Sequence, residues 1–388
     1  NYIHSKWALV IGTVIYLAYI CSFLFINNYV YFAANALLGI AFAINTTAVY
    51  TYMMEFSSKD NLPRNTGRFW AIASLSLLAG GTVYLVLSSP EAPQQENAVE
   101  RYRYYTENET RLIYAVLAIL NIASLALHCA LPTRRVANSL AETDPRPKLT
   151  VKEQVASISS TLIHPSVLLL LPRFMFNGVF FSFYMNVFPT SLQYSTVLAT
   201  RHYNLTAYYS YAFFLGAALS GLGVGSLTTR FPTFGLRPLL YCGGVCCLTA
   251  FTVAWATIPT WATARPTSGY GLVDEPRLIW VLLVAFFIGL GDSCNNITNT
   301  VICTRLIPGA APQVLSTARL YGGITSALLF FFTPYLSMNA HSGILTLLCV
   351  VNVVVSSLAL NRILKREALR AKSSVANIVP FTPLDDAT

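Results

Sequence analysis

The sequence has little charge: only 11% of its 388 residues are Asp, Glu, Lys or Arg, whereas soluble domains carry about a quarter. It lacks the His-Glu-x-x-His, Gly-x-Ser-x-Gly and phosphate-loop motifs of common enzymes. Its eight cysteines all lie in apolar stretches and show no disulfide or zinc spacing. The scarcity of charge excludes an ordinary soluble domain, and no feature predicts an enzyme, a metal site or a cofactor.

Apolar residues, in contrast, are abundant: 55% of the chain is hydrophobic and the mean hydropathy is +0.55. Apolar runs of about 20 residues, the length that a helix needs to cross a bilayer, recur along the whole chain. They lie near 7–27, 29–54, 67–88, 111–131, 166–189, 207–229, 237–259, 278–303, 319–337 and 341–361. This pattern predicts an all-α polytopic membrane protein with about ten transmembrane helices, because the strands of a β-barrel would alternate in hydropathy.

The net charge of +9 follows the loops between these runs. Basic residues gather on alternate loops, near 59–68, 134–152, 230–237 and 305–319, and in the tail after 361. The positive-inside rule then places these loops and the C-terminus in the cytoplasm of a plasma membrane or endomembrane. The basic excess therefore indicates membrane topology and does not predict nucleic-acid binding.

Two glycosylation sequons agree with this orientation. Asn108-Glu-Thr110 and Asn204-Leu-Thr206 both fall on the predicted outer side, where glycosylation of Asn108 and Asn204 can occur. The sequence thus predicts a glycoprotein.

A long polar segment, 134–165, divides the chain into four spans and six. We expect an N-terminal bundle over 1–133, a cytoplasmic linker over 134–165, a six-helix bundle over 166–361 and a cytoplasmic tail over 362–388.

The two bundles share an order of residues. Gly12 lies six residues after Lys6, as Gly243 lies six after Arg237. Asn45 lies six residues after a glycine, and so does Asn295 in the second bundle. The next helices contain "TGRFW" (66–70) and "TARLY" (317–321). These echoes indicate an internal repeat.

Parallel six-helix repeats joined by a cytoplasmic loop are the architecture of major facilitator proteins. The alignment of the echoes pairs the first helix here with the third helix of the second half. We therefore expect the first two of twelve helices to be missing, as in an N-terminally truncated chain. The stretch "GSLTTRFPTFGLR" (225–237) resembles the cytoplasmic turn of that superfamily, with Gly225, Arg230, Gly235 and Arg237 as its glycines and arginines.

Three segments carry a resemblance to a family: "LLGIAFAINTTAVYTY" (37–52), "NTGRFWAIASLSLLAGG" (65–81) and above all "GLGDSCNN" (289–296). They resemble the uncoordinated-ninety-three (Unc) family of ion-channel regulatory proteins, and the likeness implies a nematode-type paralogue. The resemblance also implies a major facilitator fold, no enzymatic activity, and a membrane-protein partner such as a potassium channel.

One intramembrane stripe is strongly polar. Asp292, Asn295, Asn296 and Asn299 lie at spacing i, i+3, i+4, i+7, on one face of a helix. Hydrocarbon offers such groups no hydrogen-bond partners, so the stripe must face protein or water. Two interpretations remain open: a lock that joins neighbouring helices, or a site that faces a central cavity and binds an ion or solute.

Two further polar residues belong to the candidate site. Asn45 is the repeat counterpart of Asn295. If both side chains faced the centre between the two bundles, they would lie opposite each other. Arg173 lies about seven residues into its span, where its side chain either reaches the cytoplasmic headgroups or contacts an anion or carboxylate in an inner cavity.

The resemblance thus implies a non-enzymatic membrane protein that modulates or escorts another membrane protein, such as a potassium channel, in the lipid bilayer. The alternative is a secondary transporter of a small solute or ion, with Asp292 as its coupling group.

Overall fold

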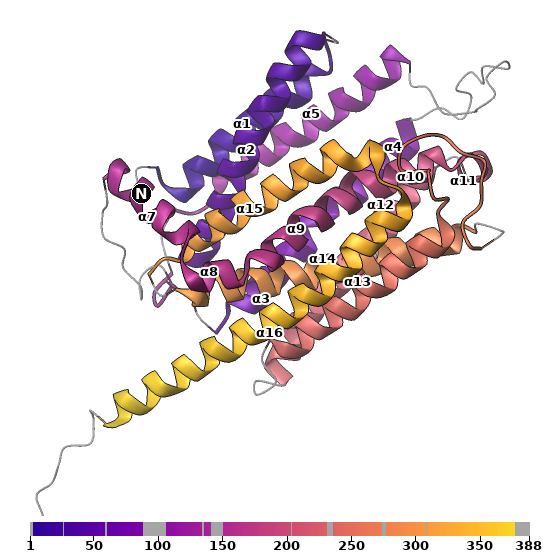
Figure 1. The fold of residues 1–388 in the computed structure, drawn as a ribbon. Coiled ribbons are helices and arrows are strands. Elements are labelled where there is room, and N and C mark those ends of the chain that lie inside the picture. Colours follow the sequence, from indigo (N-terminus) through magenta and orange to yellow (C-terminus); the bar gives the residue numbers. More distant parts are fainter. Residues whose placement is uncertain are drawn as a thin grey trace, which may run out of the picture.

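The computed structural model describes residues 3–25, 27–58, 60–87, 106–133, 136–140, 150–202, 204–230, 236–273, 277–307 and 309–376. Within these ranges the regular structure is helical, apart from one isolated bridge between Ser195 and Thr267. The helices run side by side along one common direction, with α16 extending beyond the others (Figure 1). The predicted all-α class is confirmed.

The N-terminal half begins with two antiparallel helices and ends with a third that packs against the first. Its elements are α1 (Ser5–Ser22), α2 (Asn28–Glu55), α3 (Leu62–Ala73), α4 (Leu75–Leu87) and α5 (Glu107–Ala130). Helix α1 packs on both α2 and α5, and these three helices lie together at one side of the molecule (Figure 1). Helices α3 and α4 pack instead on the second half.

The second half begins with one broken helix and continues with five long ones. The broken helix comprises α8 (Pro165–Leu169), α9 (Leu171–Ser182), the π-helix η1 (Phe183–Val187) and α10 (Phe188–Tyr194). After α11 (Thr196–Arg201), the long helices are α12 (Leu205–Arg230), α13 (Arg237–Thr257), α14 (Leu278–Leu306), α15 (Ala311–Phe332) and α16 (Met338–Ala376), with η2 (Thr333–Tyr335) between the last two.

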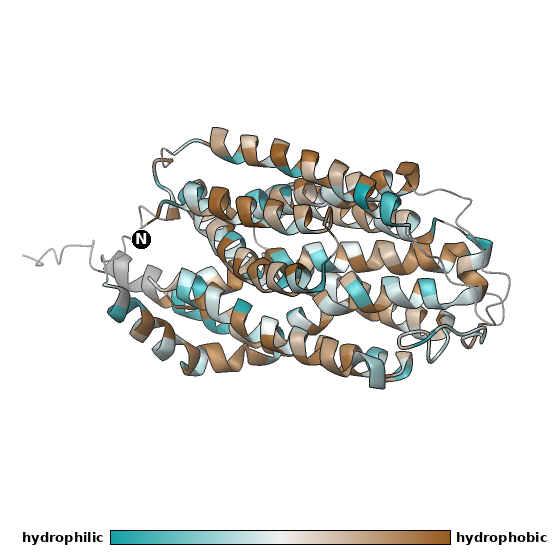
Figure 2. Ribbon diagram, turned by 90° about the horizontal axis from the view of Figure 1, so that it is seen from above, coloured by the Kyte–Doolittle hydropathy of each residue, from teal (hydrophilic) through white to brown (hydrophobic). Residues whose placement is uncertain are grey.

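In the described ranges, nine helical segments are long and apolar enough to cross a membrane, with α3 and α4 together forming one of them. The remaining predicted span, 166–189, is the broken helix, because Pro165, Pro172 and Pro189 each occupy the first turn of a new helical piece. Hydrophobic residues run along the helices, and hydrophilic ones gather mainly near helix ends and loops (Figure 2). The multi-pass membrane architecture is therefore confirmed.

The close contact between the halves is made by glycines. A Cβ atom added to Gly67 of α3 would lie 2.5 Å from the carbonyl oxygen of Gly221 on α12, and a Cβ on Gly221 would lie 2.5 Å from the oxygen of Gly67. Toward the other end, Gly81 of α4 lies against Ser210 of α12. Small residues let helix backbones approach in lipid, where packing replaces the hydrophobic drive.

The repeat echoes correspond to equivalent helix contacts. Gly12 of α1 lies directly against the Asn45 side chain of α2, because a Cβ on Gly12 would be 2.4 Å from Asn45 Oδ1. In the second half, Gly243 of α13 lies against α14, because a Cβ on Gly243 would be 2.8 Å from Cys294 Cβ and 3.8 Å from the backbone nitrogen of Asn295. The glycine of one helix thus meets the asparagine position of the next in both halves.

Helix α16 is longer than a membrane span. Its 39 residues extend about 58 Å, against about 30 Å of hydrocarbon. Near the tail, Arg366 donates hydrogen bonds to the carbonyl oxygens of Arg305 and Leu306 at the end of α14. Arg237 donates to Asn361 Oδ1 at 2.7 Å. Arginines that bind helix-terminal carbonyls complete bonds that the helix cannot make itself. Residues 362–376 therefore continue the last span and anchor it.

The predicted linker contains α7 (Val151–Leu162), which begins with a capping box. Glu153 N donates to Thr150 Oγ1 at 3.4 Å, and Thr150 N donates to Glu153 Oε2 at 2.8 Å. The bond from Thr150 N, together with one from Thr150 Oγ1 to the same carboxyl oxygen at 2.9 Å, lowers the pKa of the Glu153 carboxyl. These two bonds therefore contribute stability above the ordinary carboxyl pKa and lose it as the pH falls through the lowered value.

Replacing Thr150 with alanine is expected to speed amide hydrogen exchange in the first turn of α7 by about fivefold at neutral pH, because the cap bonds are lost. The difference between the two proteins, corrected for intrinsic pH dependence, should shrink but not vanish at a pH below the lowered pKa of Glu153, because only the bonds to the carboxylate weaken there. A difference that is unchanged in acid would show that Glu153 takes no part in the cap.

Candidate functional site

The polar stripe lies on α14, the helix that packs against both α12 and α13. Eighteen of its 29 residues are buried. Asp292, Asn295 and Asn299 retain 8%, 7% and 4% exposure, and Asn296 is half-buried. The stripe therefore faces protein along its whole length, and its members divide between two sets of neighbours.

The first set surrounds Arg173 of α9, whose side chain is fully buried. Its guanidinium donates five hydrogen bonds to groups on α14 and α16. The acceptors are Asn299 Oδ1 (3.0 Å), Thr298 Oγ1 (2.8 Å), the backbone oxygen of Asn295 (2.9 Å), Asn352 Oδ1 (3.2 Å) and Ser356 Oγ (2.6 Å). A guanidinium has five N–H groups, so these bonds can satisfy its whole donor capacity.

This arrangement differs from both sequence interpretations of Arg173. The guanidinium does not reach the headgroups, and its five acceptors are neutral amide, hydroxyl and carbonyl oxygens rather than a carboxylate or bound anion. The arginine joins α9, α14 and α16 within the second half. Such a cation is stabilised only while all its acceptors stay in place.

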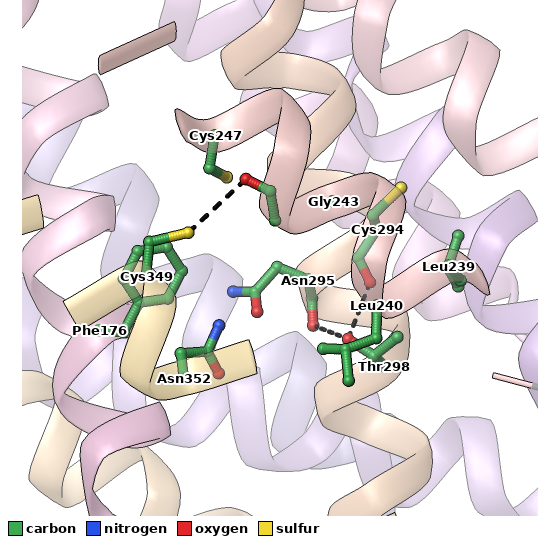
Figure 3. A pocket seen from close by; sticks show the side chains of 11 residues that line it. Phe176, Leu239, Leu240, Gly243, Cys247, Cys294, Asn295, Thr298, Cys349 and Asn352 are labelled. Atoms are coloured by element: carbon green, nitrogen blue, oxygen red, sulfur yellow. Dashed lines mark hydrogen bonds between the residues drawn. The ribbon is translucent and has the colours of Figure 1, made fainter. Parts of the chain in front are cut away.

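Asn295 connects the same helices a second time. Its backbone oxygen accepts from Arg173, and its side-chain Nδ2 donates to Asn177 Oδ1 on α9. A cavity of about 10 Å³ adjoins it, and Figure 3 shows the Asn295 and Asn352 amides beside this space. That volume is at the lower limit for one water molecule. This side of the stripe thus offers no room for a solute.

The second set of neighbours surrounds Asp292. Its carboxyl interacts with the Tyr184 hydroxyl and with Asn296, and it lies within the electrostatic field of Arg319 on α15. Tyr184 belongs to the π-helix η1, and its backbone oxygen accepts a 2.6 Å hydrogen bond from the Tyr209 hydroxyl of α12. Single π-helical turns insert an extra residue and redirect side chains. Here the turn brings a tyrosine to the carboxyl.

Arg319 extends this cluster to the N-terminal half. Its guanidinium donates to the Tyr50 hydroxyl of α2 and lies 5.3 Å from the centre of the Tyr50 ring. A carboxylate deep in the membrane is costly unless another charge or hydrogen bonds offset it. The contact between Arg319 and Tyr50 connects the two halves, and we call Asp292, Tyr184, Arg319 and Tyr50 the Asp292 cluster.

The sequence did not identify three members of this cluster. Arg319 was counted among the cytoplasmic basic residues, because the apolar run begins only at 319. Helix α15 in fact begins at Ala311, with Pro312 in its first turn, so Arg319 lies two turns inside it. The sequence signal for this earlier start is Pro312, which follows Gly309 and is typical of the first turn of a helix. Tyr50 and Tyr184 gave no signal, because tyrosines are frequent throughout this chain.

The remaining predicted site residues lie elsewhere. Asn45 is half-buried and faces α1 at Gly12, so it does not oppose Asn295 across the centre. Its Oδ1 has no hydrogen-bond partner among the residues that the structure describes. In the predicted cytoplasmic turn, Arg237 binds Asn361, whereas Gly235 and the side-chain surroundings of Gly225 and Arg230 lie outside what the structure describes.

The two predicted glycosylation sites lie at the same end of the molecule. Asn108 is exposed in the first turn of α5, and Asn204 is half-buried just before α12. Their modification stays a prediction. All eight cysteines are free thiols, and the residues that the structure describes contain no cluster of His, Cys, Asp or Glu suited to a metal ion.

Comparison with known proteins decides the family. The model of the ion channel regulatory protein UNC-93 matches residues 1–356. The chain belongs to the UNC-93 family. This match supports a non-enzymatic, multi-pass membrane protein and favours the regulator class over the transporter class.

Two curated relatives of this UNC-93 family member come from frogs. This chain is 23% identical over 350 residues to the UNC93-like protein MFSD11 of Xenopus laevis, and the match covers 86% of this chain and 76% of the relative. It is 22% identical over 352 residues to the protein of the same name from Xenopus tropicalis, covering 87% and 76%.

The fold is similar to that of a solved transporter. The crystal structure of the Major Facilitator Superfamily transporter FucP in the outward conformation aligns with a TM-score of 0.59 and 11% identity, covering 92% of this chain and 83% of FucP. At this identity the similarity concerns the fold alone. It confirms the major facilitator architecture predicted from the repeats.

Proposed function

We propose that this UNC-93 family member binds another membrane protein within the bilayer and modulates or escorts it, with a potassium channel as the class of partner to test first. The observation that carries the proposal is the internal use of the polar groups on α14. Arg173 directs five hydrogen bonds to α14 and α16. Polar groups that bond to one another inside the protein stabilise the helix bundle, so we expect a partner to bind at the outer surface of the helices.

One surface suited to a partner lies at the ends of α1, α2 and α5, on the side of the membrane away from the C-terminal tail. Phe23 stacks on Tyr114 with ring centres 4.0 Å apart, and Tyr31 packs edge-on against Phe23 at 5.8 Å. Beside them, Tyr29 and Phe32 are 87% and 71% exposed. We call these five residues the aromatic edge.

An aromatic edge of this kind can act in two ways. Tyrosine and phenylalanine anchor helices at the membrane interface, and tyrosine is also enriched among the residues that dominate the energy of binding. Because Tyr29 and Phe32 lie three residues apart on one helix, a partner helix can contact both rings at once. This geometry supports a contact site with another membrane protein.

Replacing Tyr29 and Phe32 together with alanine is expected to weaken capture of the partner channel by about tenfold or more, because two exposed anchors are lost. The measurement is co-purification of the full-length protein with a co-expressed potassium channel, normalised to the amount of folded protein. Tyr335→Ala is the matched control, since Tyr335 is an aromatic with 75% exposure in η2 of the other half.

Two results would contradict the proposal. Equal losses for the double variant and the control would show that the aromatic edge acts only as a general membrane anchor. Saturable, gradient-driven solute uptake by the purified protein in liposomes, with no change in any co-expressed channel current, would refute partner regulation.

The cytoplasmic location of the C-terminus belongs to the same proposal. The cluster of basic residues in the C-terminal part of α16, Arg362, Lys365 and Arg366, supports it through the positive-inside rule. An epitope tag after residue 388 should react with antibody only after the plasma membrane is permeabilised. Labelling of intact cells would reverse the orientation.

A further inference from the structure

A bounded groove lies between α13 and α16, which run side by side (Figure 1). It has a volume of about 470 Å³, within the range of about 300–1,000 Å³ typical of small-molecule sites. Phe251 and Trp255 line it from α13, and Ser342, Leu347 and Val350 from α16. The groove faces outward, because Trp255, Leu347 and Val350 are 41%, 65% and 47% exposed.

The groove is closed at both ends. Near the tail side, α13 and α16 meet directly, since a Cβ on Gly244 would lie 2.7 Å from Val353 Cγ2. At the other end, Met338 N donates to the carbonyl oxygen of Thr260 at 2.8 Å and ties the start of α16 to the loop after α13. Between these contacts the groove extends from Asn339 to Val350, about 16 Å along the helix, which corresponds to one leaflet.

The floor of the groove is open at Gly343. A Cβ placed on this glycine meets no atom within 4 Å, so the space above the helix backbone there is unfilled. Gly243 and Gly244 on the facing helix, by contrast, are filled by neighbouring side chains. Glycine lowers helix stability by about 1 kcal/mol relative to alanine. Gly343 therefore does not stabilise α16, but it leaves space in the groove.

Four hydroxyl or amide side chains line the groove. Asn339 and Ser342 lie at the end away from the tail, and Thr252 and Thr346 lie further along it. Thr252 Oγ1 donates to the backbone oxygen of Leu248, whereas the buried Ser342 Oγ has no hydrogen-bond partner among the residues that the structure describes. None of the nine lining residues carries a charge. An occupant must therefore be neutral, with one hydrogen-bonding group at the membrane interface and an apolar body along Phe251, Leu347 and Val350.

We propose that this groove binds a sterol, whose single hydroxyl contacts Ser342 and Asn339 and whose rigid ring system lies over Gly343 between the two helices. A phospholipid fits less well, because its phosphate would find no cation among the lining residues and its two chains would exceed a groove closed at both ends. The proposal does not depend on the partner-binding function.

The test uses the purified full-length protein in lipid nanodiscs and a photoactivatable, clickable cholesterol analogue as the probe. Saturable labelling of peptides containing Phe251–Trp255 or Asn339–Val350, competed by unlabelled cholesterol, is the expected result. Gly343→Leu fills the groove and should reduce this labelling by about tenfold. Ser342→Ala should reduce it less, because it removes one hydroxyl.

Gly323→Leu provides the matched control, because Gly323 of α15 is also exposed and a Cβ there also meets no atom within 4 Å. Labelling of the groove should be unchanged in this variant. If Gly343→Leu fails to fold, Thr346→Leu blocks the same groove from an exposed position. Equal labelling of the groove and control variants, or equal labelling by a phospholipid photoprobe that cholesterol does not displace, would overturn the proposal.

Discussion

Arg173→Met is expected to leave little folded protein. The substitution keeps an apolar stem of similar length but removes all five hydrogen bonds to α14 and α16. Asn299, Asn352, Thr298 and Ser356 would then be buried with fewer partners. Breaking a buried, hydrogen-bonded charge site of this kind costs about 3–5 kcal/mol, a large part of the stability of a typical protein.

The measurement is thermal unfolding of the purified protein in detergent, together with the fraction that elutes as a monodisperse species. Arg111→Met is the control, because the pair that Arg111 forms with Glu107 is exposed, and exposed pairs contribute about 0–1 kcal/mol. Arg173→Lys should fall between the two, since lysine keeps the charge but has three donors in place of five. Equal unfolding temperatures for Arg173→Met and Arg111→Met would contradict the assignment of Arg173 as a connecting residue.

The second large effect is expected for Asp292→Asn. This substitution keeps the size of the side chain but removes the carboxyl group that interacts with the Tyr184 hydroxyl and lies within the electrostatic field of Arg319. We expect a loss of about 1.5–3 kcal/mol, as for hydrogen bonds to charged groups, and a lower level at the cell surface. The folded fraction should still capture its partner, because Asp292 contributes to the bundle rather than to the surface.

The control for this second prediction is Asp60→Asn, at the loop before α3, which should leave stability and surface level unchanged within about 0.5 kcal/mol. A normal surface level for Asp292→Asn together with lost partner regulation would instead make Asp292 a functional group.

Much of the fold followed from the sequence, because hydropathy and repeat spacing are properties of single segments. The apolar runs predict the helices, and the echoes of Gly12 in Gly243 and of Asn45 in Asn295 indicate a repeat. The structure adds that these positions meet, Gly12 at Asn45 and Gly243 beside Asn295. The break in the span at 166–189 was also readable in principle, since Pro172 and Pro189 cannot continue a regular helix.

The partners of the polar residues could not be predicted in the same way. A helical stripe fixes which residues share a face but not which helix covers it. In the structure the Asn299 end of the stripe meets Arg173, and the Asp292 end meets Tyr184 and Arg319. This division depends on tertiary packing and on the π-helical turn at Phe183–Val187, neither of which has a periodic signature. Both the lock and the central-site interpretation had treated the stripe as one unit.

The account's central claim is that the buried polar groups of α14 connect helices, and a double-mutant cycle between Asp292 and Arg319 tests it most directly. Unfolding free energies are measured for Asp292→Asn, Arg319→Gln and the double variant. Because each single change leaves one charge without its counterpart, the double variant should be more stable than the sum of the losses predicts, by about 0.5–3 kcal/mol. Losses that simply add, with each variant fully stable at the cell surface, would show that the two groups do not connect α14 with α15.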